Sequence, residues 1–269
     1  MNFQEKLDAA IEKNNSLLCV GLDPHETKLP AAVHESFFEF NKAIIDATHD
    51  VVCAYKPNSA FYEAQGASGY EELKKTCEYI TKTYPEIPII LDFKRGDIGN
   101  TNDGYVAMAF DQLAVDAVTV HPYLGRESLE PFLIQKDKGI IILCRTSNKG
   151  SGEWQDLLVD GKPFYMHIAQ HINLSWNENN NCLLVVGATY PEEMKKIRAV
   201  VGDMTFLVPG IGAQGGDVKK TVTAGLNSQK KGMIISASRS VIFASGGDDF
   251  AVRAREEALK LRDEINKYR

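Results

Sequence analysis

The sequence predicts an α/β fold, a (β/α)8 barrel of the TIM type that occupies residues 1–269 as a single domain. Two observations lead to this prediction: eight short apolar runs of strand length, and amphipathic stretches of helical spacing between them. The apolar runs are nearly continuous and do not alternate with polar residues, which is typical of parallel strands covered on both faces. The length of 269 residues suits eight strand–helix units.

The eight expected strands are spread along the whole chain, at residues 16–22, 51–56, 87–93, 116–120, 139–144, 182–187, 204–209 and 232–237. A doubly wound open sheet is the alternative architecture, but it usually has fewer strands. The first strand–helix turn, GLDPHETKLP, also lacks the GxGxxG fingerprint of a dinucleotide-binding sheet. The barrel is therefore the preferred fold.

Two helices are expected from their apolar spacing, at residues 68–84 and 248–269. The first places Tyr70, Leu73, Cys77 and Ile80 on one face, and the second does the same with Phe250, Ala254, Ala258, Leu261 and Ile265. Residues 1–14 predict an extra leading helix, which we expect to close the bottom of the barrel.

The composition limits the classes of partner. The net charge of −6 argues against a nucleic acid or a membrane surface as the main partner. The first residues, MNFQEKLDAAIEKNN, lack the apolar core of a signal peptide, and no apolar run is long enough to span a bilayer. Five cysteines without a close pair indicate neither a disulfide framework nor a zinc site. We therefore expect a cytoplasmic protein.

Charged and polar residues occur where the expected strands end, which in a barrel is the face that carries the chemistry. They are Asp23, Lys56, Asp92, Lys94, Asp97, His121, Arg145, Ser147 and Arg239. A single charge at a strand end is most simply a solvated surface group. The stretch IILDFKRGD fits that explanation poorly, because residues two apart on a strand point to the same side. Asp92 and Lys94 are thus expected to share the barrel mouth.

A buried ion pair is costly before its pairing compensates, so stability is a weak reason for this arrangement. An alternating set of Lys56, Asp92, Lys94 and Asp97 keeps both lysines charged, because each ammonium has carboxylate neighbours. Such a set can hold a cation where negative charge develops during a reaction.

The segment PGIGAQGGD, residues 209–217, follows the seventh strand. Its glycines permit close backbone approach to a ligand, and Asp217 can cap the next helix. Barrels often bind phosphate between the loops after strands seven and eight, and Arg239 supplies a matching cation after the eighth strand. The segment and Arg239 together indicate a phosphate site.

The stretch DFKRGDIGNT, residues 92–101, resembles the signature of the orotidine 5′-phosphate decarboxylase family. The resemblance extends over the whole chain and includes Asp23, Lys56, Ser147, the PGIGAQ loop and Arg239. Arg95, Gly96 and Ser238 depart from the commonest form of the family pattern. Together with the long segment after the fifth strand, they resemble its longer-chain branch.

The resemblance implies decarboxylation of orotidine 5′-phosphate to UMP, the last step of de novo pyrimidine synthesis, with no cofactor and no metal. By that likeness Lys94 faces the carbanion at C6 of the ring and protonates it, and Asp92 lies against the departing carboxylate. Lys56 and Asp97 complete the charged network.

The same likeness assigns binding roles. It implies that Asp23 binds a ribose hydroxyl, that Ser147 reads the pyrimidine amide edge, and that Gln214 and Arg239 hold the phosphate. It also implies that Asp97, Ile98 and Thr101 reach the site of a neighbouring subunit, so a homodimer with shared active sites is expected.

Two other functions remain open from the sequence. One is a metal-dependent phosphosugar aldolase or decarboxylase on the same scaffold, and the other is a non-catalytic nucleotide-binding protein. The intact set of Lys56, Asp92, Lys94 and Asp97 argues against the second. His167 and His171, four residues apart on an expected helix, are more simply surface residues than metal ligands. The role of His121 is left open.

Overall fold

The computed structural model describes residues 1–33, 35–211 and 216–269, and eight parallel strands form its barrel. These strands are β1 Leu18–Leu22, β2 Ala54–Pro57, β3 Ile90–Arg95, β4 Ala117–Val120, β5 Gly139–Arg145, β8 Cys182–Val186, β9 Phe206–Pro209 and β10 Met233–Ala237. Their order is β2-β1-β10-β9-β8-β5-β4-β3. Parallel bridges from Tyr55 to Ile89 and from Asn58 to Asp92 join β2 to β3 and bring the two ends of the sheet together. The predicted (β/α)8 barrel is confirmed, and each of its strands falls at an expected apolar run.

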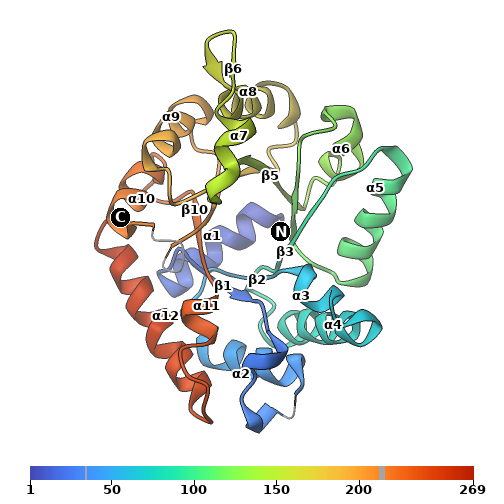
Figure 1. The fold of residues 1–269 in the computed structure, drawn as a ribbon, viewed down its shortest axis with the longest axis vertical. Helices are drawn as coiled ribbons and strands as arrows, with labels where there is room; N and C mark the ends of the chain where they lie inside the picture. Colours follow the sequence, from blue (N-terminus) through green and yellow to red (C-terminus); the bar gives the residue numbers. More distant parts are fainter. Residues whose placement is uncertain (34, 212–215) are drawn as a thin grey trace.

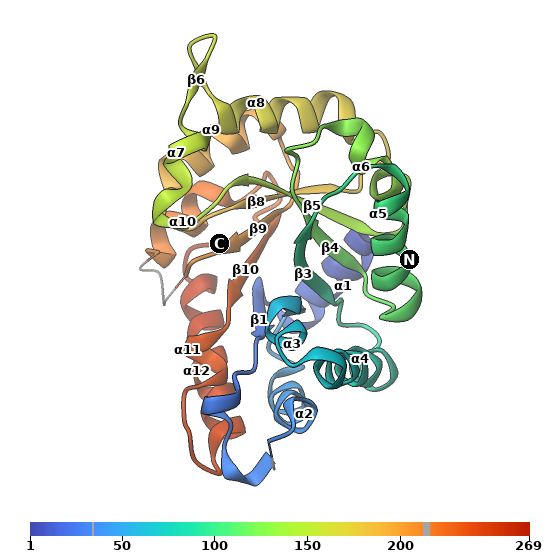
Figure 2. The same ribbon diagram turned by 45° about the vertical axis from the view of Figure 1, so that its right-hand side comes forward.

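Helices surround the strands (Figures 1 and 2). They are α1 Phe3–Asn14, α2 Phe37–Thr48, α3 Ser59–Glu63, α4 Gly66–Thr83, α5 Gly99–Val106, α6 Arg126–Leu133, α7 Gly152–Gln155, α8 Phe164–His171, α9 Pro191–Val201, α10 Val218–Gly225, α11 Arg239–Ile242 and α12 Phe250–Asn266. Short π-helical turns extend α5 over Ala107–Gln112 and α8 over Ile172–Trp176. The expected helix 68–84 is α4, which buries Leu73, Cys77 and Ile80 but leaves Tyr70 partly exposed. In α12, Leu261 is likewise only partly buried.

The leading helix α1 lies across the amino-terminal end of the barrel, as the sequence predicts. Asn2 and Glu5 form a capping box that starts it. Lys6 then pairs with Asp116, just before β4, at 2.9 Å. Thr205, just before β9, donates to Gln4. These contacts close the end of the barrel opposite to the candidate site.

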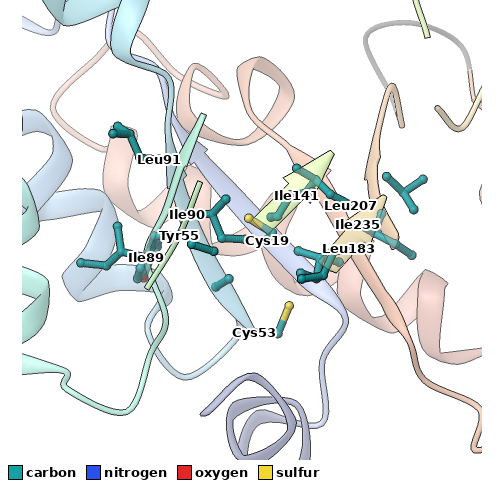
Figure 3. Close-up of a cluster of buried hydrophobic side chains, with 14 of the residues drawn as sticks. Cys19, Cys53, Tyr55, Ile89, Ile90, Leu91, Ile141, Leu183, Leu207 and Ile235 are labelled. Carbon is teal, nitrogen blue, oxygen red and sulfur yellow. The ribbon is translucent and has the colours of Figure 1, made fainter. Parts of the chain in front are cut away.

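The core consists of the strand side chains and the helix faces packed on them. Strands β1, β4, β8 and β10 are buried along their whole length. Figure 3 shows part of this core, with labelled side chains from β1, β2, β3, β5, β8, β9 and β10. Its apolar surface supplies the main driving force for folding and fixes the strands rigidly. The strand ends can therefore hold functional side chains in defined positions.

The sequence did not predict the organisation of the long segment after β5. It contains α7 and a short antiparallel hairpin of β6 Leu158–Val159 and β7 Lys162–Pro163. The hairpin projects from the barrel at the top of Figures 1 and 2. Its strands have two residues each and mostly exposed side chains, so they carry too little apolar pattern to be predicted from sequence.

All five cysteines are buried and free. Within residues 1–33, 35–211 and 216–269, no helix is both long and apolar enough to cross a bilayer.

Candidate active site

The carboxyl ends of the strands enclose a cavity of about 620 Å³. This volume lies within the usual range of small-molecule sites. Six of the residues predicted from the sequence line it: Asp23, Lys56, Asp92, Lys94, Ser147 and Arg239. They come from the ends of β1, β2, β3, β5 and β10, so residues far apart in the sequence meet because parallel strands all end at the same face.

Asp92 is the centre of the charged group. Its Oδ2 accepts from Lys56 Nζ at 3.1 Å, and its Oδ1 accepts from Lys94 Nζ at 2.6 Å. Two neutral side chains add hydrogen bonds: Thr119 Oγ1 donates to Oδ1 at 2.8 Å and Asn58 Nδ2 donates to Oδ2 at 3.3 Å. Both oxygens of this buried carboxylate are therefore shared between a cation and a neutral donor.

Asp92 and Lys56 each favour the ionised state of the other. Burial by itself raises the pKa of the Asp92 carboxyl, but the ammonium groups of Lys56 and Lys94 outweigh it and hold that pKa well below its ordinary value. Burial by itself lowers the pKa of Lys56, but the carboxylates of Asp92 and Asp23 outweigh it and hold the pKa above its ordinary value. A fixed negative charge therefore lies between two lysines at neutral pH.

Lys94 differs from the sequence-based expectation in its exposure. Its side chain is 48% exposed, whereas that of Asp92 is 10% exposed, so only Asp92 and Lys56 are buried. The physical reason is an irregularity in β3: Leu91 pairs with Val118 of β4, but the next pair is Arg95 with Val120. Lys94 lies in this bulge with a left-handed φ of 46°, a conformation that costs a non-glycine residue about 1–2 kcal/mol. The bulge directs its ammonium into the open cavity.

Asp97, Ile98 and Thr101 do not join this group. Within the described ranges they are absent from the cavity lining. The Oδ1 atom of Asp97 accepts from the backbone N–H of Ile98 at 2.7 Å, and the Ile98 side chain is 59% exposed. Thr101 is exposed at the start of α5. Of the four alternating charges that the sequence predicts, a single chain therefore brings together Lys56, Asp92 and Lys94 but not Asp97.

Asp23 and Ser147 lie on opposite sides of the cavity. The Oδ1 atom of Asp23 accepts from the backbone N–H of Asn58 at 3.1 Å, which fixes the carboxylate beside Lys56. Ser147 lies against Gly187, where an added Cβ would come within 2.7 Å of the Ser147 Cα atom. Glycine is therefore required at position 187 for this close approach.

Arg145 organises the loop after β5, a role that the sequence did not indicate. The guanidinium is buried and donates to Ser151 Oγ at 2.7 Å, to Gln155 Oε1 at 3.1 Å and to Asp156 Oδ2 at 3.2 Å. It also lies 3.8 Å from the centre of the Tyr190 ring. Ser151 and Gln155 line the cavity, so Arg145 shapes the site without lining it.

The structure describes part of the phosphate site that the sequence predicts. Arg239 is exposed at the first position of α11, next to Ser238, and both line the cavity. Asp217 caps α10 as predicted, with Oδ1 accepting from the backbone N–H of Lys220. Gln214 lies outside the described residues.

Sequence reasoning missed Thr119 and Asn58, and it placed Arg145 at the end of the fifth strand without assigning it a role. Asn58 stands two residues after Lys56, in the motif AYKPN, and its place at a strand end is a signal that could have drawn attention to it. Thr119 gave no such signal, because a threonine inside an apolar strand is an ordinary strand residue.

The histidines fall outside the charged group. The Nε2 atom of His121 lies 3.0 Å from the carbonyl oxygen of Gly96, so its ring packs against the loop after β3. His167 Nε2 lies 2.8 Å from the carbonyl oxygen of Val159, and His171 is exposed. In the described part of the chain, His, Cys, Asp and Glu residues form no cluster of three that could hold a metal ion.

A second, apolar cavity of about 1020 Å³ adjoins the first and shares Leu143, Trp154 and Gln155 with it. Much of its lining is exposed apolar surface, with Tyr123 at 85% and Trp154 at 67%. Exposed apolar surface of this extent is typical of an interaction site.

The chain is similar to known proteins over almost its whole length. Residues 16–254 match the model of the "Orotidine 5'-phosphate decarboxylase / HUMPS family". The orotidine 5′-phosphate decarboxylase of Cellvibrio japonicus is 56% identical over 99% of this chain and 98% of its own length. Among solved structures, the OMP decarboxylase of Leishmania donovani superposes with a TM-score of 0.86 at 40% identity, covering 100% of this chain and 98% of that one. The UMP synthase of the same organism gives 0.87 at 41% identity over 98% of this chain, which spans 56% of that longer protein.

Proposed function

The chain belongs to the orotidine 5′-phosphate decarboxylase / HUMPS family, and from this premise we infer that it converts orotidine 5′-phosphate to UMP and CO2. It is a carbon–carbon lyase that acts in pyrimidine biosynthesis. Residues 1–269 form its catalytic domain. The observation that carries the proposal is the ionised Asp92 held between Lys56 and Lys94 at the mouth of the barrel.

The chemistry explains why such a group is useful. Loss of CO2 leaves an electron pair on C6 in the plane of the pyrimidine ring, where no adjacent carbonyl can delocalise it. The protein must stabilise this charge with groups that are fixed before the substrate binds. An ammonium group that lies beside a fixed carboxylate on a rigid strand meets this requirement without reorganisation during the reaction.

We propose that Lys94 faces C6, stabilises the developing carbanion and then donates the proton that completes UMP. Its half-exposed ammonium projects into the cavity and is within reach of a bound ring. Asp92 lies against the substrate carboxylate, and departure of CO2 relieves the like-charge contact. Lys56 keeps Asp92 ionised and oriented. The reaction proposed in this way requires neither a cofactor nor a metal.

The remaining cavity residues bind the rest of the nucleotide. Asp23 accepts from a ribose hydroxyl, with Lys56 beside it, and Ser147 contacts the amide edge of the pyrimidine. Arg239 and Gln214 hold the phosphate, far from the bond that breaks. Binding energy gained at such a remote group can promote closure of the site and exclusion of water.

We further propose a homodimer in which Asp97, Ile98 and Thr101 complete the partner's site. Two observations support it: the Ile98 side chain is 59% exposed although it is apolar, and the nearby apolar cavity exposes Tyr123 and Trp154. A mixture of Lys94→Ala and Asp97→Ala subunits tests the arrangement, because one site of each hybrid dimer is then intact. Recovery of activity is expected, and demonstrated hybrids without activity would refute shared sites.

We expect the enzyme to act in the cytoplasm, because five free and buried cysteines are typical of a reducing compartment. The metal-dependent phosphosugar enzyme considered from the sequence is not favoured, since the relatives that align over the full chain are named orotidine 5′-phosphate decarboxylases.

The deciding experiment follows the loss of orotidine 5′-phosphate absorbance after addition of purified protein treated with EDTA. Turnover by wild type is expected, and an inert but folded wild type would overturn the proposed function. Lys94→Ala should bind UMP and remain folded while losing turnover. Substantial decarboxylation by this variant would contradict the role of Lys94 alone.

A further inference from the structure

The hydroxyl of Thr119 connects the two ends of Lys94. Thr119 Oγ1 accepts from the Lys94 backbone N–H at 3.0 Å and donates to Asp92 Oδ1 at 2.8 Å. The same Oδ1 atom accepts from the Lys94 ammonium at 2.6 Å. A closed ring of hydrogen bonds therefore runs from the backbone of Lys94 through Thr119 and Asp92 to the tip of the Lys94 side chain.

The register of the sheet explains why this hydroxyl is needed. Between the pairs Leu91–Val118 and Arg95–Val120, residues 92–94 of β3 lie opposite Thr119 alone. The bulge turns the Lys94 N–H away from the regular ladder, so the N–H requires another acceptor. Thr119 is fully buried and provides that acceptor from the neighbouring strand.

Each hydrogen bond of Thr119 fixes a different part of the charged group. The hydrogen bond that Thr119 accepts from the Lys94 N–H stabilises Lys94 in its left-handed conformation, with φ at 46°. An L-residue adopts this conformation only when its surroundings hold it there. The bond that Thr119 donates fixes the orientation of the Asp92 carboxylate. Without the hydroxyl, the bulge can relax, and the ammonium then moves relative to the substrate.

We infer that Thr119 is a positioning residue of the reaction, which holds the β3 bulge and the Asp92 carboxylate so that the Lys94 ammonium faces C6 of the pyrimidine ring. This inference rests on the proposed function. It predicts that the loss of the hydroxyl lowers kcat much more than it weakens nucleotide binding, because both hydrogen bonds of Thr119 go to Lys94 and Asp92.

Thr119→Val tests the inference, because valine keeps the shape of threonine and removes only the hydroxyl. A displacement of about 1 Å at the reacting atoms costs roughly 100-fold, so we expect kcat to fall about 100-fold. The dissociation constant of UMP should stay within about threefold of wild type, since the phosphate and ribose contacts are unchanged. Thr119→Ser restores the hydroxyl and should keep kcat within about fivefold of wild type.

Thr76→Val is the matched control. Thr76 is also fully buried, and its hydroxyl likewise donates one hydrogen bond, to the Glu72 carbonyl, and accepts one, from Asn41 Nδ2. It lies in α4, outside the cavity lining. Its substitution should lower the thermal midpoint by a similar amount and leave kcat unchanged.

Three results would overturn the positioning role: wild-type kcat in folded Thr119→Val, an equal loss of kcat in Thr119→Ser, or an equal loss in Thr76→Val. If Thr119→Val does not fold, Thr119→Cys replaces it, since a thiol has a similar volume and is only a weak donor. Wild-type kcat in the folded cysteine variant would then refute the inference. Failure of the proposed function is recognised separately, because wild type itself would not decarboxylate orotidine 5′-phosphate.

Discussion

Lys56 and Arg145 are both cations buried at the carboxyl ends of barrel strands, yet their neighbours differ. Lys56 faces two carboxylates, Asp92 and Asp23, that come from other strands. Arg145 donates to Ser151, Gln155 and Asp156, all within eleven residues along its own chain segment, and stacks on Tyr190. Lys56, Asp92 and Asp23 are far apart in the sequence and form what we call the charge-matched group. Arg145 instead stabilises a loop of its own chain segment.

The difference separates two ways in which a barrel uses a buried charge. Around Lys56 the strand ends bring opposite charges together and keep them ionised, which prepares an electrostatic environment for a reaction. Around Arg145 the guanidinium satisfies polar groups of a loop and so gives that loop one conformation. Loss of the first group should therefore affect the chemical step, and loss of the second should affect folding and substrate binding.

The largest effect is expected for Asp92→Asn, which keeps the shape of the side chain and removes its charge. Loss of the electrostatic contact proposed between Asp92 and the reacting group should lower kcat roughly 1000-fold. Lys56 also loses its nearest carboxylate, so the unfolding free energy should fall by about 3 kcal/mol. Steady-state kinetics and urea denaturation measure the two effects.

Asp116→Asn is the control for that experiment. Asp116 is also paired with a lysine, Lys6, at 2.9 Å, but it lies at the amino-terminal end of the barrel. Its substitution should lower the unfolding free energy and leave kcat unchanged. If kcat is the same in Asp92→Asn and Asp116→Asn, Asp92 contributes to the stability of the fold and not to the chemical step. The difference between Asp92 and Arg145 would then not hold.

How far the sequence predicted the site depends on the range of the contacts. The strands were predictable because parallel buried strands are continuously apolar, and Asp23, Lys56 and Asp92 were predictable because they stand where those strands end. The exposure of Lys94 and the contact of Thr119 with Asp92 were not, because both depend on a register shift between β3 and β4. A bulge leaves no periodic signal in a strand of six residues.

The Arg145 network illustrates a different limit. The sequence places an arginine at the end of the fifth strand, but it does not tell whether the side chain enters the cavity or turns back into the loop. The direction is decided by Ser151, Gln155 and the ring of Tyr190, which is brought in by the turn before α9. Such a choice depends on tertiary packing and not on local propensity.

Arg145→Met should give the next largest effect. Methionine fills much of the space but makes none of the three donor contacts, so the unfolding free energy should fall by roughly 3 kcal/mol. The loop that carries Ser151 and Gln155 then loses its fixed conformation, and kcat/KM should fall about 10- to 100-fold. We expect a rise in KM to account for most of this change, in contrast with Asp92→Asn.

Arg198→Met provides the comparison, since Arg198 is another largely buried arginine that donates to backbone carbonyls, among them those of Met204 and Gly232. These carbonyls precede β9 and β10, at the end of the barrel away from the cavity. This variant should lose stability with kcat/KM unchanged. If it loses as much kcat/KM as Arg145→Met, the effect of Arg145 is one of general stability and not of loop conformation.

A smaller effect is expected for Gly187→Ala, which probes the contact between β8 and the loop after β5. The new methyl group would come within 2.7 Å of the Ser147 Cα and Cβ atoms, so Ser147 must move. Overpacking of this kind costs about 1–3 kcal/mol, and kcat/KM should fall about 10-fold as the proposed contact of Ser147 with the ring is displaced. In Gly225→Ala the atoms nearest to the new methyl group belong to the flexible ends of Met233 and Met194, so kcat/KM should stay at the wild-type value. Unchanged kcat/KM in Gly187→Ala would exclude a substrate contact by Ser147.

The smallest effect concerns pH, because the contribution of Asp92 and Lys56 to the unfolding free energy should stay constant near neutral pH. The pKa of Asp92 is held below its ordinary value of 3.8, so its contribution to stability is complete above that value and is lost only as pH falls through the lower folded-state pKa. The pKa of Lys56 is held above 10.5, so its contribution is complete below that value and is lost as pH rises through the folded-state pKa. The difference in unfolding free energy between wild type and Asp92→Asn should therefore be constant from about pH 5 to pH 9 and shrink only in stronger acid or base. Urea denaturation across this range provides the measurement. If the difference in unfolding free energy halves between pH 8 and pH 6, Asp92 gains a proton near neutrality. The lysines would then not keep Asp92 charged, and the contrast with Arg145 would be lost.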